Sequence, residues 1–321
     1  MNNQTFVNDI DFYCIIHFYL VVWYIRTNEV NFYRKNGYLV KENLIPIKEI
    51  KKINNIVKKI IFREKKKKIK IKNQGGIQSY NNYHFVYNSN SSKNKEILRL
   101  NNPQNRHKLF FNLSRNNKII SILKKLIGGT IRFHLGKLNF KLPNKKKGSL
   151  VEWHQDFAFY PHTNDDLITV GIYLEDCYEQ NGPLKIIKGS HKKELFSHHS
   201  NDNYFVGKIN TKKNKINLKK SVSLTGKAGS VAFFHCRTIH GSGLNHTNGS
   251  RPLILFGYRA CDAWPIINDG NPHPETNFEN YDENIIHGKK SIIPRCTDVP
   301  IIIPLPKKKH YVSIYQLQKS N

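Results

Sequence analysis

The sequence predicts a mainly β protein with flanking helices, built on a double-stranded β-helix of the jelly-roll, cupin-like type. Short apolar stretches of strand character recur between turn-forming residues through the second half of the 321-residue chain, and helical periodicity is scarce there. Closure of two antiparallel sheets against each other is a common solution for such a pattern. A hydrophobic content of 39%, with 18 Phe and 16 Tyr, is enough for a substantial core. The length fits one large domain or a domain with an appendage.

Residues 1–29 are treated as an N-terminal extension. An apolar run at residues 12–25 is shorter than the roughly 20 residues that span a membrane. Asp9 and Asp11 precede this run, where a signal peptide carries basic residues. We expect a buried helix or strand, or a weakly ordered extension. Membrane anchoring is the alternative.

Two helices are expected before the strand-rich half. Apolar residues recur at helical spacing through residues 44–61, and Pro46 fits the first turn, where its missing N–H costs nothing. Residues 110–127 form an amphipathic pattern that Gly128 and Gly129 end, as glycine does at helix C-termini.

Two strands are expected in the same part of the chain. Residues 38–40 follow the turn signal Asn36-Gly37, and residues 130–141 alternate between apolar and polar. The lysine-rich run at residues 64–72 is interpreted as a solvated, partly mobile segment, with an anion-binding patch as the alternative.

The charge balance is strongly basic, with 52 Lys and Arg against 23 Asp and Glu and a formal net charge of +29. A nucleic acid or an anionic membrane is one interpretation. The excess is mostly lysine, is spread through the chain and accompanies many Asn, Ile, Tyr and Phe, which favours coding bias instead. A basic surface would still attract an anionic substrate. The five cysteines are odd in number and form no C-x-x-C, so we expect a reducing, cytoplasmic location without a disulfide framework.

Residues 149–192 are the segment around which the rest is organised. Parts of it alternate as a strand with one buried face, and it contains His154 and Asp156. Residues two apart in a strand project to the same side, so the imidazole and the carboxylate converge. They match two of the three ligands of the two-His, one-carboxylate site that holds non-heme Fe(II). The H-x-D pattern by itself is weak, because the chain has 15 His.

Downstream residues supply the remaining features of such a site. An apolar strand at residues 229–235 leads to His240, and Arg251 opens the next apolar strand. A guanidinium pairs with a carboxylate through two hydrogen bonds, which suits a dicarboxylate cosubstrate. His235 is a rival to His240, but a regular strand would turn it to the other face. The further rivals nearby in sequence are His162, His191 and His246.

With these segments in place, the sequence resembles the phytanoyl-CoA dioxygenase family of Fe(II)- and 2-oxoglutarate-dependent oxygenases. The resemblance runs from about Val30 to the end, so residues 30–321 are expected to form a single domain of this type. It implies the jelly-roll fold with N-terminal helices packed outside it. The matching segments are WHQD (153–156), DDLITVGIYLED (165–176), NGPLKIIKGSHK (181–192), GSVAFFH (229–235), HGSGLN (240–245) and RPLILFGYRACDAWP (251–265).

The resemblance implies a hydroxylase that uses Fe(II), 2-oxoglutarate and O2 and releases succinate and CO2. His154, Asp156 and His240 would hold the iron, and Arg251 would pair with the far carboxylate of 2-oxoglutarate. The presence of Asp156 favours hydroxylation, because halogenating relatives lack this carboxylate.

The resemblance also suggests four supporting positions. Ser242 matches a position that contacts the cosubstrate, and Ile172 would line the same pocket. Lys141 matches a lysine near the mouth of the site, although a solvated lysine is the simpler interpretation. His198 matches a histidine with a supporting or substrate-orienting role.

Three alternatives remain at this stage. An AlkB-type nucleic-acid demethylase would suit the charge, but its two arginines are spaced R-x5-R, whereas Arg251 and Arg259 are spaced R-x7-R. A non-catalytic jelly-roll binding module would consume no 2-oxoglutarate. A zinc-holding cupin-like protein would bind metal without needing Arg251. We expect a small-molecule or acyl substrate, such as an acyl-CoA, an amino acid, a lipid or a secondary metabolite, with no specific nucleic acid and no membrane contact.

Overall fold

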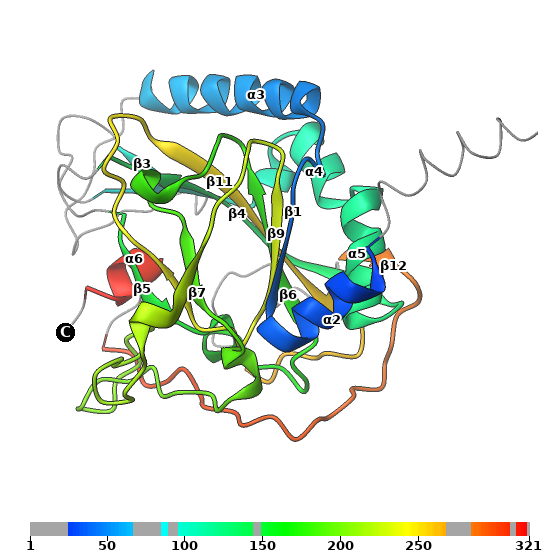
Figure 1. The fold of residues 1–321 in the computed structure, drawn as a ribbon, viewed down its shortest axis with the longest axis vertical. Coiled ribbons are helices and arrows are strands. Elements are labelled where there is room, and N and C mark those ends of the chain that lie inside the picture. Colours follow the sequence, from blue (N-terminus) through cyan, green and yellow to red (C-terminus); the bar gives the residue numbers. More distant parts are fainter. Residues whose placement is uncertain are drawn as a thin grey trace, which may run out of the picture.

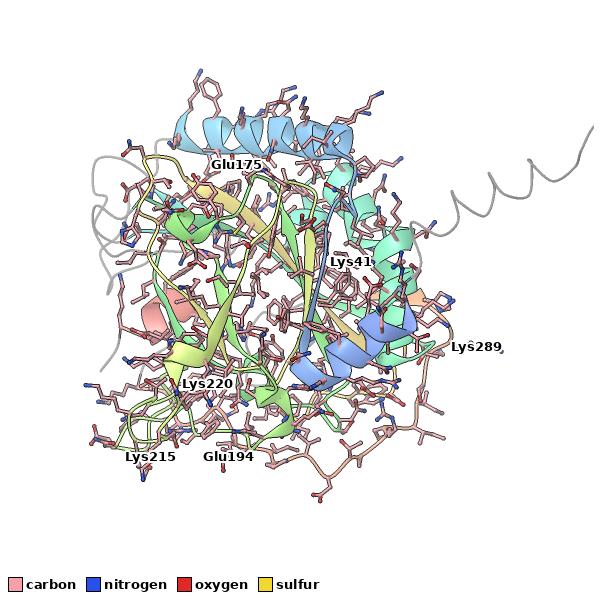
Figure 2. All side chains as sticks on the ribbon, viewed as in Figure 1. Lys41, Glu175, Glu194, Lys215, Lys220 and Lys289 are labelled. Atoms are coloured by element: carbon pink, nitrogen blue, oxygen red, sulfur yellow. The ribbon has the colours of Figure 1, made fainter. Side chains whose placement is uncertain are left out.

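The computed structural model describes residues 25–66, 85–88, 96–143, 149–267, 284–308 and 313–319. Most of the apolar run at residues 12–25 lies outside this part, as does most of the lysine-rich run. Within the described residues, no helix combines the length and the hydropathy that crossing a membrane requires. The labelled Lys215, Lys220 and Lys289 side chains lie at the periphery and are exposed (Figure 2), in keeping with charge spread over the surface.

Two antiparallel sheets form the centre of the molecule (Figure 1), which confirms the predicted jelly roll. The large sheet runs, in spatial order, β1 (Tyr38–Lys41), β9 (Val231–His235), β6 (Leu167–Tyr173), β11 (Arg251–Ala260), β4 (Ile131–Lys141), β3 (Ile97–Asn101) and β2 (Phe85–Tyr87), with β12 (Ile285–His287) on β4. The small sheet runs β5 (Val151–His154), β10 (His240–Ser242), β7 (Leu184–Ile187) and β8 (Ser221–Leu224).

Helices cover the outer face of the large sheet (Figure 1). Ile50 and Ile53 of α3 (Ile47–Lys66) and Ile122 of α5 (Asn117–Ile127) pack in one cluster with Val170 and Phe256 of the sheet. Their burial removes apolar surface from water, which is the main stabilising contribution to such a layer. The remaining described helices are α2 (Thr27–Asn36), α4 (Lys108–Ser114), α6 (Ile314–Leu317) and the short 3-10 turns η1 (Pro103–Asn105), η2 (Asp156–Ala158), η3 (Glu179–Asn181), η4 (Ser190–Lys192) and η5 (Leu218–Lys220).

The prediction of a single helix at residues 110–127 is wrong. Two helices, α4 and α5, occupy this stretch, and Asn116 separates them in extended conformation. Its side-chain oxygen accepts hydrogen bonds from the backbone N–H groups of Lys118 and Ile119, at 3.0 and 3.4 Å. Such an N-cap starts a new helix and so interrupts the old one. Gly128 ends α5 with φ 95°, as expected of glycine there.

The C-terminal segment wraps the domain, as the sequence analysis expected. Residues 284–308 run round the outside of the strands (Figure 1). The backbone N–H of Arg295 donates to the carbonyl of Asp262, and that of Thr297 donates to the carbonyl of Thr163, each at 3.0 Å. The chain then reaches α6, which lies beside β5 and closes that end of the small sheet.

Candidate active site

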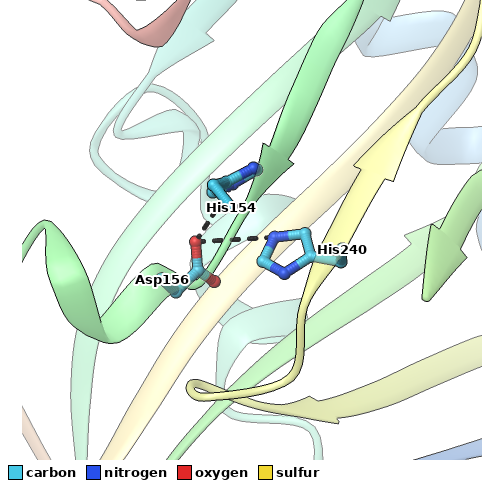
Figure 3. A group of neighbouring side chains, drawn as sticks. All are labelled: His154, Asp156 and His240. Carbon is cyan, nitrogen blue, oxygen red and sulfur yellow. Dashed lines mark ion pairs between the residues drawn. The ribbon is translucent and has the colours of Figure 1, made fainter. Parts of the chain in front are cut away.

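Three potential ligands meet where the two sheets face each other. His154 ends β5, Asp156 begins η2 immediately after it, and His240 opens β10 directly opposite His154 in the β5–β10 ladder. Asp156 Oδ1 lies 3.7 Å from His154 Nε2 and 3.6 Å from His240 Nε2 (Figure 3). One ligand atom from each residue falls within 4.8 Å of the other two. The structure therefore brings together the three residues that the sequence analysis selected.

The hydrogen bonds of the two rings determine which nitrogen faces the centre. Nδ1 of His154 lies 2.8 Å from the carbonyl of Glu152, and Nδ1 of His240 lies 2.8 Å from the carbonyl of Thr238. A carbonyl only accepts, so each Nδ1 donates, and in the neutral ring Nε2 carries a lone pair. Burial lowers the pKa of His240 to about 4, which keeps its ring neutral near pH 7.

The carboxylate is held in its charged form beside these rings. Burial by itself raises the pKa of Asp156, but His240, His154 and Lys137 lower it, and the net pKa lies well below its ordinary value. Thr169 Oγ1 of β6 donates to Asp156 Oδ2 at 2.8 Å, which leaves Oδ1 towards the two nitrogens. Two lone pairs and a carboxylate oxygen facing one point repel one another without a cation between them. The donor set thus fits a divalent metal with two nitrogen ligands and one oxygen ligand.

His198 supports the backbone between two of the ligands. Its Nδ1 lies 2.8 Å from the carbonyl of Phe196, so its Nε2 accepts, and the backbone N–H of Gln155 donates to it at 2.9 Å. The Gln155 side chain is fully buried on the opposite side and bonds to the carbonyl of Arg237 and the N–H of Phe196. His198 therefore orients the turn that carries His154 and Asp156, and it does so only as a neutral ring.

We expect the metal-free protein to lose stability on acidification because of His198. Burial lowers the pKa of its ring to about 3, whereas the unfolded chain has the ordinary value of roughly 6.5. Above pH 6.5 neither state is protonated, so stability is unaffected. As the pH falls from 6.5 towards 3, only the unfolded state takes up the proton, and the free energy of unfolding decreases, by about 2 kcal/mol between pH 7 and pH 5.

Denaturant unfolding at pH 7 and pH 5 checks this expectation. The variant His198→Phe should show a smaller pH-dependent loss, because nothing at this position titrates, and it should bind Fe(II) about tenfold more weakly because Gln155 N–H loses its acceptor. His246→Phe is the matched control, since His246 is exposed. An equal loss of unfolding free energy between pH 7 and pH 5 in wild type and His198→Phe would contradict the assignment of this loss to His198.

Two cationic side chains are buried side by side near the other end of β10. Lys141 and Arg251 are directly opposite each other in the β4–β11 ladder and are 6% and 5% exposed. Lys141 Nζ donates to Ser242 Oγ at 2.7 Å, and burial together with the charge of Arg251 pushes the pKa of Lys141 well down. Arg251 donates only to backbone carbonyls, those of Asn181 at 3.1 Å and Gly182 at 2.7 Å. Among the described residues, neither cation forms an ion pair with a carboxylate. The pair is therefore built to receive an anion.

Glycine is required where the chain passes this pair of cations. Gly182 has φ 70°, and a Cβ on it would lie 3.0 Å from Lys141 Cε and 3.0 Å from the carbonyl oxygen of Leu244. A side chain there would displace the lysine and strain the backbone. The interpretation of Lys141 as a solvated lysine is wrong, because its side chain is buried and hydrogen-bonded to Ser242.

Comparison with known proteins decides the family. The family model described as phytanoyl-CoA dioxygenase matches residues 33–253. The chain belongs to the phytanoyl-CoA dioxygenase family. It is 33% identical over 294 residues to the "Probable alpha-ketoglutarate-dependent hypophosphite dioxygenase" of Stutzerimonas stutzeri, with 90% of this chain and 95% of that protein covered. It is 27% identical to the human peroxisomal phytanoyl-CoA dioxygenase, with 79% of this chain and 73% of that protein covered.

A solved structure shows the same fold. EctD from S. alaskensis with 2-oxoglutarate and 5-hydroxyectoine superposes with a TM-score of 0.60 at 18% identity, and the match covers 88% of this chain and 89% of that one. As a member of the phytanoyl-CoA dioxygenase family, this chain is an Fe(II)- and 2-oxoglutarate-dependent dioxygenase, with O2 as cosubstrate. Alpha-ketoglutarate in the relative's name is the same compound as 2-oxoglutarate.

The structure places Ile172 away from the pocket that it was expected to line. Ile172 is fully buried in the outer cluster with α3 and α5. Thr169, which contacts Asp156, lies three positions before Ile172 on β6. Successive side chains of a strand alternate between faces, so Thr169 and Ile172 point to opposite sides of the sheet. Tyr173 lies on the same face as Thr169, and its hydroxyl donates to the carbonyl of Leu224 at 2.8 Å. The sequence analysis missed both Thr169 and Tyr173. The signal that could have found them is the alternation of β6, once the polar Thr169 is taken to face the metal ligands.

The rival histidines lie elsewhere. His235 Nε2 is 3.8 Å from Asp165 Oδ2, and the His235 and His191 rings are 5.2 Å apart, in a separate group at the end of β9. The His162 ring packs against His134, with ring centroids 5.3 Å apart. In the described part of the chain, the metal-compatible group contains His154, Asp156 and His240 and none of these rivals.

Proposed function

We propose that His154, Asp156 and His240 hold Fe(II) and that Arg251, Lys141 and Ser242 hold the far carboxylate of 2-oxoglutarate. The observation that carries this assignment is the buried pair of cations, which has no carboxylate partner among the described residues and is joined to the His240 strand by the hydrogen bond from Lys141 to Ser242. His240 and Ser242 lie two residues apart on β10, so they share a face with about 7 Å between them. A short dicarboxylate spans that separation.

The protein residues contribute binding, orientation and exclusion of water. When bound, Fe(II) and 2-oxoglutarate supply the oxidation of a substrate by O2, with succinate and CO2 as coproducts. Glu152 and Thr238 orient the two imidazoles through their Nδ1 atoms, so that Nε2 faces inward without a proton. Thr169 fixes one carboxylate oxygen of Asp156 and leaves the other free to bind. These contacts preorganise the ligands before the metal arrives.

Hypophosphite is the first substrate to test, because the relative from Stutzerimonas stutzeri is named for it and matches nearly the whole chain. Its oxidation would place one oxygen atom of O2 in a P–H bond to give phosphite and the other in succinate. Oxidative decarboxylation of 2-oxoglutarate releases one carbon as CO2 and supplies the other two of the four electrons that reduce O2.

Anaerobic titration tests the assignment of the site. Addition of Fe(II) and then 2-oxoglutarate to the purified protein is expected to give the weak visible charge-transfer band of the chelate. Admission of O2 with hypophosphite should then release succinate and phosphite in equal amounts. A zinc-holding protein or a binding module would show no 2-oxoglutarate-dependent band. Absence of the band from folded protein would therefore overturn the proposal.

A further inference from the structure

The side chain of Gln318, which follows α6, pairs with the edge of the metal-bearing strand β5. This strand is the outermost one of the small sheet, and an edge strand leaves backbone groups without a partner strand. The N–H of Glu152 donates to Gln318 Oε1 at 2.9 Å, and Gln318 Nε2 donates to the carbonyl of Glu152 at 3.4 Å. Opposite residues of an antiparallel ladder exchange hydrogen bonds in this way. The amide of Gln318 therefore takes the place of a further strand at this residue.

Glu152 is also the residue whose carbonyl orients a metal ligand. Nδ1 of His154 donates to this carbonyl at 2.8 Å, and Nε2 of the same ring lies 3.7 Å from Asp156 Oδ1. The N–H and the carbonyl of one residue belong to the two planar peptides on either side of it. A partner that binds both groups therefore restrains φ and ψ of Glu152, and with them the direction in which the imidazole of His154 points.

The same amide reaches the second support of the turn at residues 154–156. Gln318 Nε2 also donates to the carbonyl of Gly207, at 2.7 Å. The backbone N–H of Gly207 donates to the carbonyl of His198 at 3.1 Å, and the ring of His198 accepts from the N–H of Gln155. One side chain thus joins the two backbone segments that orient this turn.

The hydrogen-bonding capacity of this amide is fully used in a buried setting. Gln318 is 6% exposed, its Oε1 accepts one hydrogen bond and its Nε2 donates both of its hydrogens. The N–H of Glu152 requires an acceptor, which fixes the position of the amide oxygen. Removal of the amide would take this partner from the N–H of Glu152 and from the carbonyl of Gly207, and a backbone group left unsatisfied is costly.

Neighbouring residues of α6 keep Gln318 in place beside β5 (Figure 1). Tyr315 is buried, and its ring centroid lies 5.2 Å from the guanidinium of Arg99 on β3. Arg99 is itself held by Asn139 of β4, to which its Nε donates at 2.8 Å. Leu317 packs in one apolar cluster with residues of η2, the turn that begins with a metal ligand. The amide is therefore presented by a docked segment.

We propose that Gln318 is a positioning residue of the metal site: its amide fixes the backbone of Glu152, and through that carbonyl the imidazole of His154. This inference rests on the proposed function, because it takes His154 as a ligand of Fe(II). The hydrogen bonds described for Lys141 and Arg251 involve neither Glu152 nor Gln318. The role of Gln318 is therefore in metal binding and not in binding of the cosubstrate.

Removal of the amide tests the proposal. Gln318→Met keeps the approximate size of the side chain and loses all three hydrogen bonds. We expect it to bind Fe(II) about tenfold more weakly, while the 2-oxoglutarate concentration that half-forms the visible band at saturating Fe(II) stays within about twofold of wild type. In the metal-free protein, hydrogen exchange of the Glu152 amide should be about tenfold faster. Unchanged Fe(II) affinity, or an equal loss of affinity for Fe(II) and 2-oxoglutarate, would overturn the proposal.

Three further variants separate the hydrogen bonds from the docking of α6. Gln318→Glu keeps the size and the acceptor but turns a carboxylate towards two carbonyls, so it should also weaken Fe(II) binding about tenfold. Leu317→Ala removes packing and keeps the amide, so its Fe(II) affinity should stay within about twofold of wild type even if its stability falls. Lys319→Met is the surface control, because Lys319 is the exposed neighbour of Gln318. A loss of Fe(II) affinity in Leu317→Ala equal to that in Gln318→Met would overturn the role of the amide.

The two proposals fail separately. Absence of the 2-oxoglutarate band from wild-type protein that binds Fe(II) would contradict the proposed function alone, because Fe(II) affinity and amide exchange still decide the role of Gln318. A normal band in wild type, with wild-type Fe(II) affinity in Gln318→Met, would contradict only the role of Gln318.

Discussion

Replacement of His240 or Asp156 by alanine is expected to abolish turnover, with a fall in kcat/KM of at least about 10³-fold, because a metal ion contributes several kcal/mol to the reaction. Each variant removes a ligand atom from a group whose members lie within 4.8 Å of one another. The measurement is 2-oxoglutarate-dependent succinate release, with bound Fe(II) quantified in parallel. Succinate release and bound Fe(II) should be lost together, since binding of the metal is a prerequisite for activity.

Two histidine variants make this result specific. His246→Ala should behave like wild type, because His246 is exposed and is not part of the metal-compatible group. His235→Ala should retain Fe(II), because His235 lies against Asp165 in the separate group at the end of β9. If His235→Ala lost the metal while His240→Ala kept it, the assigned ligand set would be incorrect.

Removal of the buried guanidinium is expected to have the second largest effect. Arg251→Met should raise the concentration of 2-oxoglutarate needed to form the visible band by about 10²-fold, because the far carboxylate would lose a buried, charge-assisted partner. Arg251→Lys should recover only part of this loss, since an ammonium cannot make two parallel hydrogen bonds. Fe(II) binding without cosubstrate should be unchanged in both variants.

A double-mutant cycle with Lys141→Met checks that the two cations share one ligand. The two residues are directly opposite each other across β4 and β11, so the effects of Arg251→Met and Lys141→Met on 2-oxoglutarate binding should not be additive. Wild-type affinity for 2-oxoglutarate in Arg251→Met would contradict the assigned position of the far carboxylate.

Much of the site can be predicted from local sequence pattern. The separation of His154 and Asp156 by one residue makes their side chains converge at the end of a strand, whatever the rest of the fold does. Arg251 opens an apolar strand, and His240 follows the end of another apolar strand by five residues. The family resemblance selects both residues. The interruption between α4 and α5 is local too, yet the amphipathic pattern of residues 110–127 hid the capping role of Asn116.

The sequence by itself determined the class of fold, the family and the candidate ligands of a metal and a dicarboxylate, because strand alternation and motif spacing are properties of short segments. Only the tertiary structure decided which face of β6 turns inward, and with it that Thr169 supports Asp156 while Ile172 packs under the helices. It also decided that Lys141 is buried beside Arg251 and that Arg99 lies opposite Asn139. These relations depend on strand register, which joins residues far apart in the chain and is set by the packing of the whole sheet.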